Sequence, residues 1–416
     1  MITLKPALQT TQGRSRNWSG AVLVNGFAEI AEGDKRSEFA VLATPGLTAW
    51  ATVGTGPYRG SIVVGGVLYV VSGSYLYSVS AGGVSTSLGT IAGAGPVRIA
   101  GNYTEVAIAA NGAGYVYSGG ILSTPVPFSV SDVLYADGYI VWQIADSEQF
   151  CISALDDALT YDAADIASAE GFPDDIVGMA WDHRELQIYG ERSAEIFYNS
   201  GNAAFPFDRQ GNSFIERGCF DRDSIVKLDN SVTFVGDARI VYTLQGYQPQ
   251  RISTHWVEYM LRDATYVRSW TYTQEGHKFY VLECDAGTLC FDFSTGAWHR
   301  RASWGGDHWR CNGVVAAYGK LLMGDRASGK LYEPSLDVFT EDGAPIGMDI
   351  YLPTIDAGRE RKTMYAFEVL CESGTGNASA ADPQIMLTYS DDNGHTWSNE
   401  MRRGMGGPGA YRTRSI

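Results

Sequence analysis

Residues 106–117, Val106-Ala-Ile-Ala-Ala-Asn-Gly-Ala-Gly-Tyr-Val-Tyr117, hold an apolar run, an Asn-Gly pair and a second run that ends in aromatic residues. Apolar runs of this length joined by a short glycine-containing turn predict an antiparallel hairpin. The same plan recurs six more times, in residues 68–77, 138–152, 186–197, 232–242, 279–291 and 321–332. The hairpin is therefore the repeating unit of this chain.

The spacing of the hairpins indicates how they assemble. One residue in the second strand of each unit marks the period: Tyr77, Tyr117, Cys151, Phe197, Tyr242, Phe291 and Tyr332. The six spacings between these markers average 42.5 residues, close to the ~40–50 residues of one propeller blade. Small antiparallel sheets arranged radially cover one another's faces and leave few exposed edges. We therefore predict an all-β protein with a β-propeller of about seven blades; two sandwiches built from unrelated hairpins are the alternative.

Two regions lie outside the repeat. Residues 1–40 are polar and irregular and predict an arm or a strand that closes the ring, so that the propeller spans residues 41–340. Residues 341–416 predict a small C-terminal β module, with strands in 345–353, 364–371 and 385–389 separated by a loop at 372–382. Residues 163–170, within 156–175, form the one plausible short helix.

Composition and charge exclude several classes of protein. The chain is 45% apolar and 19% charged, which is typical of a globular protein and not of a disordered one. Its formal net charge is −16, and no run of lysine and arginine exceeds two residues, which argues against binding to nucleic-acid backbones. No apolar stretch is long enough to span a membrane. The N-terminus has no signal-peptide pattern, so we expect folding in a cytoplasm.

The cysteines and histidines predict no metal site, and nothing in the sequence predicts a bound cofactor. Six cysteines occur without a Cys-x-x-Cys pair, and six histidines are isolated from one another. Buried, reduced thiols are the expected state. A hairpin turn at Ala286-Gly287 would place Cys284 and Cys290 on opposite faces of a sheet, where they could not form a disulfide.

Residues 390–397, Ser-Asp-Asp-Asn-Gly-His-Thr-Trp, fit the Asp-box pattern S-x-D-x-G-x-T-W. Its physics is that of a hairpin turn, in which the aspartate accepts backbone N–H groups and the glycine adopts a positive φ. Proteins that resemble sialidases carry such boxes away from the catalytic centre. A sialidase also needs Phe/Tyr-Arg-Ile-Pro, and Tyr58-Arg-Gly-Ser61 lacks the Ile-Pro. We predict a structural turn made by Ser390, Asp392, Gly394, Thr396 and Trp397, with no catalytic residue.

Several stretches, taken in order, resemble one family: the tail-hub proteins of short-tailed bacteriophages, also called packaged-DNA stabilisation proteins. The resemblance is carried by Ala43-Thr-Pro-Gly-Leu47, Arg59-Gly, Val67-Leu-Tyr-Val-Val71, Leu88-Gly-Thr-Ile-Ala-Gly-Ala-Gly-Pro-Val-Arg98, Pro173-Asp-Asp-Ile-Val177, His183-Arg-Glu-Leu186, Arg251-Ile-Ser253 and the Asp-box with the arginine- and glycine-rich segment that follows it. The match runs from about residue 40 to residue 416. The family has a further basic strand after Arg412-Thr-Arg414, where this chain stops at Ile416.

The resemblance implies a structural virion protein of the phage tail and not an enzyme. Members form a ring, hexameric in the family, that lies below the portal and adaptor as part of the head-to-tail connector. This hub retains the packaged genome until ejection and supports a needle or plug and the tailspikes. Trp298, Trp304 and Trp309 would suit the faces of such a ring, with core packing as the alternative.

Other functions remain open from the sequence. In a tail hub, acidic walls around the path of the DNA would let double-stranded DNA pass without binding it. An Asp-box propeller that binds or hydrolyses carbohydrate is the main alternative to a tail hub. A monomeric propeller scaffold in the host cytoplasm is a third reading.

Overall fold

The regular structure consists almost entirely of short strands. The computed structural model describes residues 6, 8–12, 19–31, 38–162, 164–211, 213–352, 354–355, 363–374, 382–392 and 394–411. Within these residues there are 36 strands, one α-helix and one 3₁₀-helix. No helix among them is long and apolar enough to cross a membrane.

Seven sheets form blades 1 to 7, each with four antiparallel strands, and additional strands bring the sheets of blades 6 and 7 to six. Blades 1 to 3 comprise β5 (Tyr58–Val64), β6 (Val67–Ser72), β7 (Tyr75–Val79) and β8 (Ser85–Thr90); β9 (Arg98–Gly101), β10 (Val106–Ala110), β11 (Ala113–Ser118) and β12 (Ile121–Ser123); and β13 (Val130–Ala136), β14 (Tyr139–Ile144), β15 (Gln149–Ile152) and β16 (Ile166–Ser168). Blades 4 and 5 comprise β17 (Ile176–Asp182), β18 (Glu185–Gly190), β19 (Ala194–Asn199) and β20 (Phe207–Arg209); and β21 (Val226–Leu228), β22 (Ser231–Val235), β23 (Val241–Gln245) and β24 (Gln248–Arg251). Blades 6 and 7 comprise β25 (Val267–Gln274), β26 (His277–Cys284), β27 (Gly287–Asp292) and β28 (Ala297–Arg301); and β29 (Cys311–Ala317), β30 (Lys320–Asp325), β31 (Lys330–Ser335) and β4 (Gly46–Thr52).

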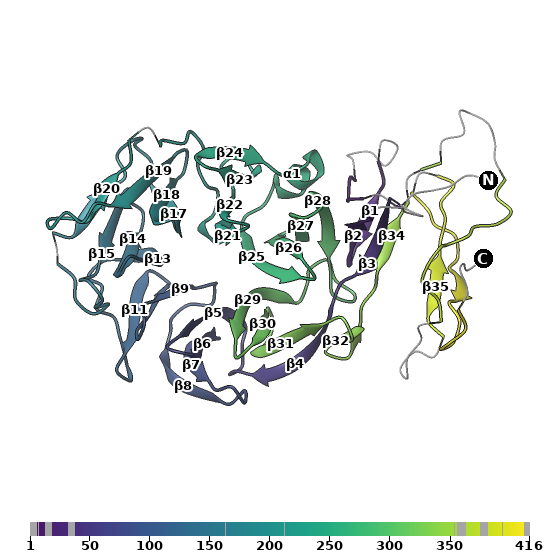
Figure 1. The fold of residues 1–416 in the computed structure, drawn as a ribbon, viewed down its shortest axis with the longest axis horizontal. Helices are drawn as coiled ribbons and strands as arrows, with labels where there is room; N and C mark the ends of the chain where they lie inside the picture. The colour runs from purple at the N-terminus through teal and green to yellow at the C-terminus, as the bar shows by residue number, and fades with distance from the viewer. Residues whose placement is uncertain are drawn as a thin grey trace. The chain divides into compact units, whose positions relative to one another are not determined.

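The blades form a closed ring. The first strand of each blade contacts the first strand of the next, and β29 of blade 7 contacts β5 of blade 1. Figure 1 shows the blades around this ring, with the purple strand β4 beside the green β31. The antiparallel pairing of β4 with β31 therefore joins the N-terminal part of the chain to its last blade. The closing strand is β4 and not a strand within residues 1–40.

Seven separate apolar cores hold the ring, one between each pair of neighbouring blades. In β10, Val106 and Ile108 pack toward blade 1, whereas Ala107 and Ala109 pack toward blade 3. Because side chains alternate between the faces of a strand, a strand buried on both faces reads as a continuous apolar run. The predicted propeller of seven blades is confirmed, and each of the seven marker residues lies on the third strand of its blade.

Additional elements extend blades 6 and 7. β1 (Val22–Val24) pairs in parallel with β28, and β34 (Asp349–Tyr351) follows β1 in the same sheet. β2 (Gly26–Ile30) and β3 (Phe39–Ala43) form a hairpin, and β32 (Thr340–Glu341) and β33 (Ala344–Pro345) continue the sheet beyond β4. The helix α1 (His255–Leu261) follows blade 5, and the 3₁₀-helix η1 (Arg222–Ser224) precedes β21.

The chain divides into two compact units. The larger contains residues 7–10 and 22–350, and the smaller contains residues 1–6, 11–21 and 351–416. In the smaller unit β35 (Gln384–Leu387) pairs antiparallel with β36 (Met401–Gly404). β35 confirms the strand predicted at 385–389. Residues 363–374 contain no extended strand, so the prediction at 364–371 was wrong. Residues 412–416, where the family resemblance ends, lie outside the described residues.

Several local predictions differ from the structure. The alanine-rich segment 163–170 holds the edge strand β16 and not a helix, because pairing with β15 outweighs the weak helix propensity of the segment. The helix α1 was missed, although Thr254 caps it by accepting the backbone N–H of Val257. Cys284 pairs with Gly287, so the turn lies one residue earlier than predicted.

The cysteines and tryptophans also have defined places. All six cysteines are free, and Cys284 and Cys290 lie in different cores on the two faces of blade 6. Trp298 and Trp309 are fully buried, whereas Trp304 is 66% exposed. The alternative of core packing is therefore confirmed for Trp298 and Trp309, whereas Trp304 lies on the surface.

Candidate functional site

Polar side chains gather where the first strands of the blades begin. They line a cavity of about 510 Å³ together with the loops that precede these strands. The cavity therefore lies at the end of the ring where the first strands begin. We call it the mouth cavity and define it by Arg59, Arg222, Arg268, Glu283, Asn312 and Arg326, together with Asp221, which caps η1, and Asp223, which lies within η1.

Arg59 on β5 is a structural residue of the cavity wall. It is 2% exposed, and its guanidinium donates to the carbonyl oxygens of Gly73, Ile91, Ala92 and Gly95. These bonds fix the loop before β9 against blade 1. Burial, and further the charge of Arg268, lower the pKa of Arg59.

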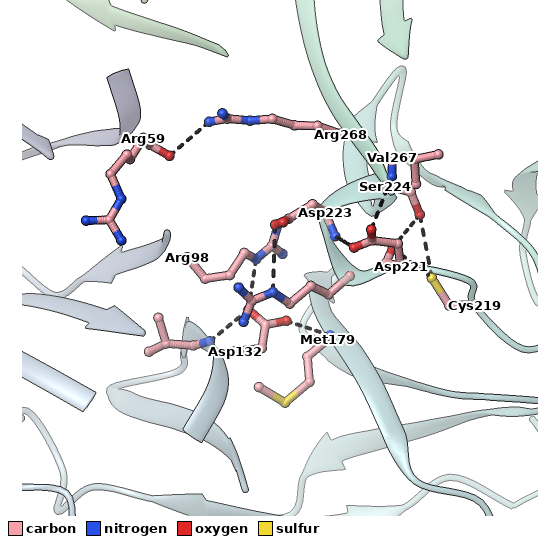
Figure 2. A network of polar contacts seen from close by, with 12 residues as sticks. Arg59, Arg98, Asp132, Met179, Cys219, Asp221, Asp223, Ser224, Val267 and Arg268 are labelled. Atoms are coloured by element: carbon pink, nitrogen blue, oxygen red, sulfur yellow. Dashed lines mark hydrogen bonds and ion pairs between the residues drawn. The ribbon is translucent and has the colours of Figure 1, made fainter. Parts of the chain in front are cut away.

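A network around Arg98 links blades 2 to 5 (Figure 2). The Nε atom of Arg98 lies 2.8 Å from Asp132 Oδ1, and its Nη1 atom lies 4.0 Å from Asp223 Oδ1. The other oxygen of Asp132 accepts the backbone N–H of Met179 on β17 at 2.9 Å. Burial alone would lower the pKa of Arg98, but the charges of Asp132 and Asp223 outweigh it and raise that pKa. Arg98 therefore stays ionised as the centre of the network.

Asp221 joins blade 5 to blade 6. One carboxylate oxygen accepts the backbone N–H of Val267 at 3.2 Å, and the other accepts that of Asp223 at 2.9 Å. Burial, followed by the charge of Asp223, raises the pKa of Asp221. Cys219, which follows blade 4, donates its thiol to the backbone oxygen of Asp221. Among the described residues, the strands of blades 5 and 6 belong to separate sheets and do not pair with each other. The Asp221 carboxylate thus provides a hydrogen bond that links the two blades.

Two further contacts complete the wall on the side of blades 6, 7 and 1. Glu283 at the end of β26 pairs with Arg326 of blade 7 at 2.8 Å. The side-chain amide of Asn312 donates to the backbone oxygen of Tyr58 at 3.1 Å. Within the described part of the chain, no group of three His, Cys, Asp or Glu residues is placed to hold a metal ion.

These residues were missed by the sequence analysis, although a signal existed. Arg59, Arg98, Asp132, Arg268 and Asn312 each occupy one of the first three positions of the first strand in a blade. Five blades thus place a charged or amide side chain within the first three positions of their first strand. Aligning the first strands of the blades, and not only the central hairpins, would have revealed this pattern.

The Asp-box residues lie in the smaller unit, between β35 and β36. Asp392 accepts the backbone N–H of Thr396 at 2.8 Å and its hydroxyl at 2.6 Å. The hydroxyl of Ser390 accepts the N–H of Gly394, whose φ is +79°. The bonds from Thr396, followed by that from Ser390, lower the pKa of Asp392. The indole of Trp397 is 47% exposed and meets the ring of Tyr351 edge-on at 5.7 Å.

Comparison with known families identifies the chain. The model of the bacteriophage P22 Gp10 β-propeller matches residues 8–338, and that of the Gp10 β-sandwich matches residues 347–416. The chain belongs to the bacteriophage P22 Gp10 family. The resemblance to the tail-hub and packaged-DNA stabilisation proteins of short-tailed phages is confirmed. Membership makes the chain a bacteriophage structural protein of the virion tail, in a family of proteins that assemble with other virion components.

Several solved structures are similar to the chain at low sequence identity. BamB from Moraxella catarrhalis is 13% identical, with 80% of this chain and 98% of that chain covered and a TM-score of 0.43. The extracellular domain of a one-component system from B. thetaiotaomicron is 10% identical over 69% of this chain and 40% of that chain, with a TM-score of 0.47. Streptogramin B lyase is 8% identical over 70% and 97%, also with a TM-score of 0.47. No curated protein sequence matches the chain.

Family membership does not favour the carbohydrate alternative. The Asp-box lies in the region matched by the Gp10 β-sandwich and not in a propeller blade. Ser390, Asp392, Gly394 and Thr396 are bonded to one another within the turn.

Proposed function

We propose that the chain forms the ring-shaped hub of a short phage tail. In this role a hexameric ring lies below the portal and adaptor, retains the packaged DNA and supports a needle or plug and the tailspikes. The match of the two Gp10 family models, which together span residues 8–338 and 347–416, carries the proposal.

The internal construction of the propeller supports a passive mechanical role. Each of the seven blade interfaces has its own apolar core. The Arg98–Asp132 pair and the bond from Val267 to Asp221 add polar links between blades. Close-packed interiors have low compressibility and transmit strain. Such a scaffold would hold neighbouring virion proteins at fixed distances under the pressure of packaged DNA.

Exposed apolar residues offer surface for a second copy of the chain. Val63, Val67, Tyr103 and Leu155 lie at strand turns on one face of blades 1 to 3, and Tyr103 is 80% exposed. Obligate interfaces commonly bury ~2,000 Å² or more and are more apolar than ordinary surface. We propose this face as part of the contact between subunits of the ring.

We further propose that the Asp-box is a structural turn. Its hydrogen bonds fix the connection between β35 and β36 and leave Asp392 no unpaired oxygen for catalysis. Virions that carry Asp392→Asn should therefore assemble normally, and their glycan-cleaving activity should not change. Loss of a glycan-cleaving activity in this variant would support the carbohydrate alternative.

The proposed hub role is tested by removing the chain from the phage that encodes it. A nonsense mutation in its gene should yield particles that package DNA and then lose it, measured as a fall in nuclease-resistant genomes per capsid. Wild-type protein supplied in trans is the control and should restore retention. Particles that keep their DNA and infect normally without the chain would contradict the proposal.

A further inference from the structure

Two arginines of the mouth cavity, Arg59 and Arg268, have no carboxylate partner among the described residues, and the Arg59 guanidinium already donates to four carbonyl oxygens. Arg268 on β25 donates from Nη2 to the backbone oxygen of Arg59 at 2.9 Å. Among the ion pairs of the described residues none involves Arg268, whereas Arg98, Arg222 and Arg326 each face a carboxylate within 4.0 Å. The chain has a net charge of −16, so carboxylates outnumber cationic side chains, and a guanidinium in a cavity without a carboxylate partner is unusual.

The neighbours of Arg268 make this position favourable for an anion. Figure 2 shows the Arg268 guanidinium bonded to the backbone oxygen of Arg59, with the Arg59 side chain pointing away from it. Burial is the main cause that lowers the pKa of Arg59, and the charge of Arg268 lowers it further. An anionic group at Arg268 would supply the missing counter-charge and form a charge-assisted hydrogen bond with the remaining donors of its guanidinium.

Asn312 supplies a second group without a partner. It is 7% exposed and lines the same cavity. Its amide nitrogen is engaged by the backbone of Tyr58, while Oδ1 accepts no hydrogen bond among the described residues. Buried polar atoms are nearly always paired. A ligand that brings both an anionic group and an N–H donor would satisfy Arg268 and Asn312 together.

The size and charge of the cavity select among anionic ligands. A volume of about 510 Å³ suits a small molecule or a short chain segment and is too small for a nucleic-acid duplex. Asp221, Asp223 and Glu283 line the same space and would repel a polyphosphate, which carries several negative charges, more strongly than a single carboxylate. A peptide, by contrast, carries backbone N–H groups for such acceptors and a carboxylate for Arg268.

From this geometry we propose that the mouth cavity binds a polypeptide segment through a carboxylate on Arg268, with a backbone N–H of that segment donating to Asn312. The carboxylate belongs to an acidic side chain or to a C-terminus. This deepens the proposed hub function by giving the propeller a docking point for another virion protein, and it rests on that function for the identity of the partner alone.

The test uses the purified full chain and small synthetic peptides. Binding of acetyl-Ala-Asp-Ala-amide is compared with that of acetyl-Ala-Asn-Ala-amide by ligand-observed NMR, and acetyl-Ala-Ala-Ala with a free C-terminus distinguishes the second source of carboxylate. We expect at least one carboxylate peptide to bind about tenfold more tightly than the asparagine peptide, the ratio that one charge-assisted hydrogen bond supplies.

Two variants assign the preference to the cavity. Arg268→Gln should reduce the tenfold ratio to about one, and Arg268→Lys, which keeps the charge, should retain part of it. The control Arg217→Gln alters an exposed arginine outside the cavity and should leave the ratio unchanged. Equal binding of all peptides, or a ratio that survives Arg268→Gln, would overturn the proposal.

A further arm tests the class of ligand. Inorganic phosphate that binds more tightly than either carboxylate peptide, and in an Arg268-dependent way, would overturn the polypeptide assignment. All these measurements use the isolated chain, so their outcome is independent of whether the chain is found at the tail of a virion.

Discussion

At the scale of single residues, blade 6 contains a buried imidazole that has no hydrogen-bond partner in the described part of the chain at one of its nitrogen atoms. His299 on β28 is 2% exposed, and its Nε2 atom has no hydrogen-bond partner among the described residues. Burial first, and then the charges of Arg301 and His277, lower the pKa of His299 to about 3. The folded protein therefore holds this imidazole neutral where the unfolded chain would protonate it.

This shift makes stability depend on pH in a defined direction. As the pH falls from about 6.5 toward 3, the unfolded state binds a proton at His299 that the folded state does not, so the free energy of unfolding decreases. Between pH 6.5 and 5.0 the loss should be roughly 2 kcal/mol. Urea unfolding at the two pH values should show a smaller loss for His299→Gln than for the wild type.

The control for this measurement is His255→Gln, at an exposed imidazole of α1. It should leave the acid-induced loss of stability in place. A His299→Gln protein that loses as much stability as the wild type would mean that the imidazole is protonated in the folded state.

Glycine at one position permits the last blade to meet the first. A Cβ atom on Gly324 of β30 would lie 2.1 Å from Cγ of the buried Tyr58 ring. We predict that Gly324→Ala destabilises the protein by about 1–3 kcal/mol, because overpacking forces the ring or the strands apart. Gly211→Ala is the matched control, since its Cβ would meet nothing within 4 Å. Equal unfolding midpoints for the two variants would show that the blades part here without cost.

At the scale of elements, the closing strand β4 stabilises the whole ring and not only the residues that it contacts. It brings the N-terminal part of the chain to blade 7 by pairing with β31, and Leu47 inserts into the core between blades 6 and 7. A ring opened at this seam would expose apolar faces of two blades. The hydrophobic area that β4 covers therefore stabilises the whole propeller.

Truncation of this anchor gives the prediction for the element. Leu47 is 1% exposed, and Leu47→Ala should lower the free energy of unfolding by about 2–5 kcal/mol. Leu336→Ala, at a leucine that is 38% exposed, should have a much smaller effect in the same urea titration. Similar losses for both would contradict the role given to β4.

The elements also show what the sequence could predict. The central hairpins were found because both faces of their strands are buried, which leaves an apolar run on each side of a turn, as in Val106–Ala110. The outer strands were not found individually. β16 has three half-buried residues, and β24, Gln248–Arg251, is mostly polar. Strands at the edge of a blade are defined by backbone pairing with a neighbour, which leaves little trace in side-chain pattern.

The mouth cavity was hidden for a related reason. Arg59 and Arg268 are 209 residues apart and meet only because the ring closes. Tyr58-Arg-Gly-Ser61 was examined as a failed catalytic motif, yet its arginine anchors a loop through four carbonyl oxygens. The Asp-box was recognisable because all its bonds lie within seven residues.

At the scale of the whole molecule, the net charge governs the relation to DNA. In the proposed hub role, a chain with a net charge of −16 would retain a genome by obstruction and not by attraction, since affinity for the phosphate backbone comes from clustered cations. The arginines of the mouth cavity do not change this, because Arg222 and Arg326 have acidic partners and the Arg59 guanidinium is occupied by carbonyl oxygens.

A direct prediction is that the purified chain does not bind duplex DNA. Fluorescence anisotropy of a labelled duplex should stay flat up to about 10 µM protein, even at low salt, where non-specific binding by cationic proteins is strongest. A binding constant whose logarithm falls linearly with the logarithm of salt concentration would show that a cationic surface binds the DNA. This result would contradict obstruction as the means of retention.

The claim on which the rest depends is that this propeller is a fixed part of the tail in the finished virion. Cryo-electron microscopy of purified particles tests it most directly, with the symmetry at the tail vertex determined from the images. The account predicts density for a ring of seven-bladed propellers below the portal, and its absence from particles that lack the chain. Complete tail vertices whose density leaves no room for the propeller would contradict it.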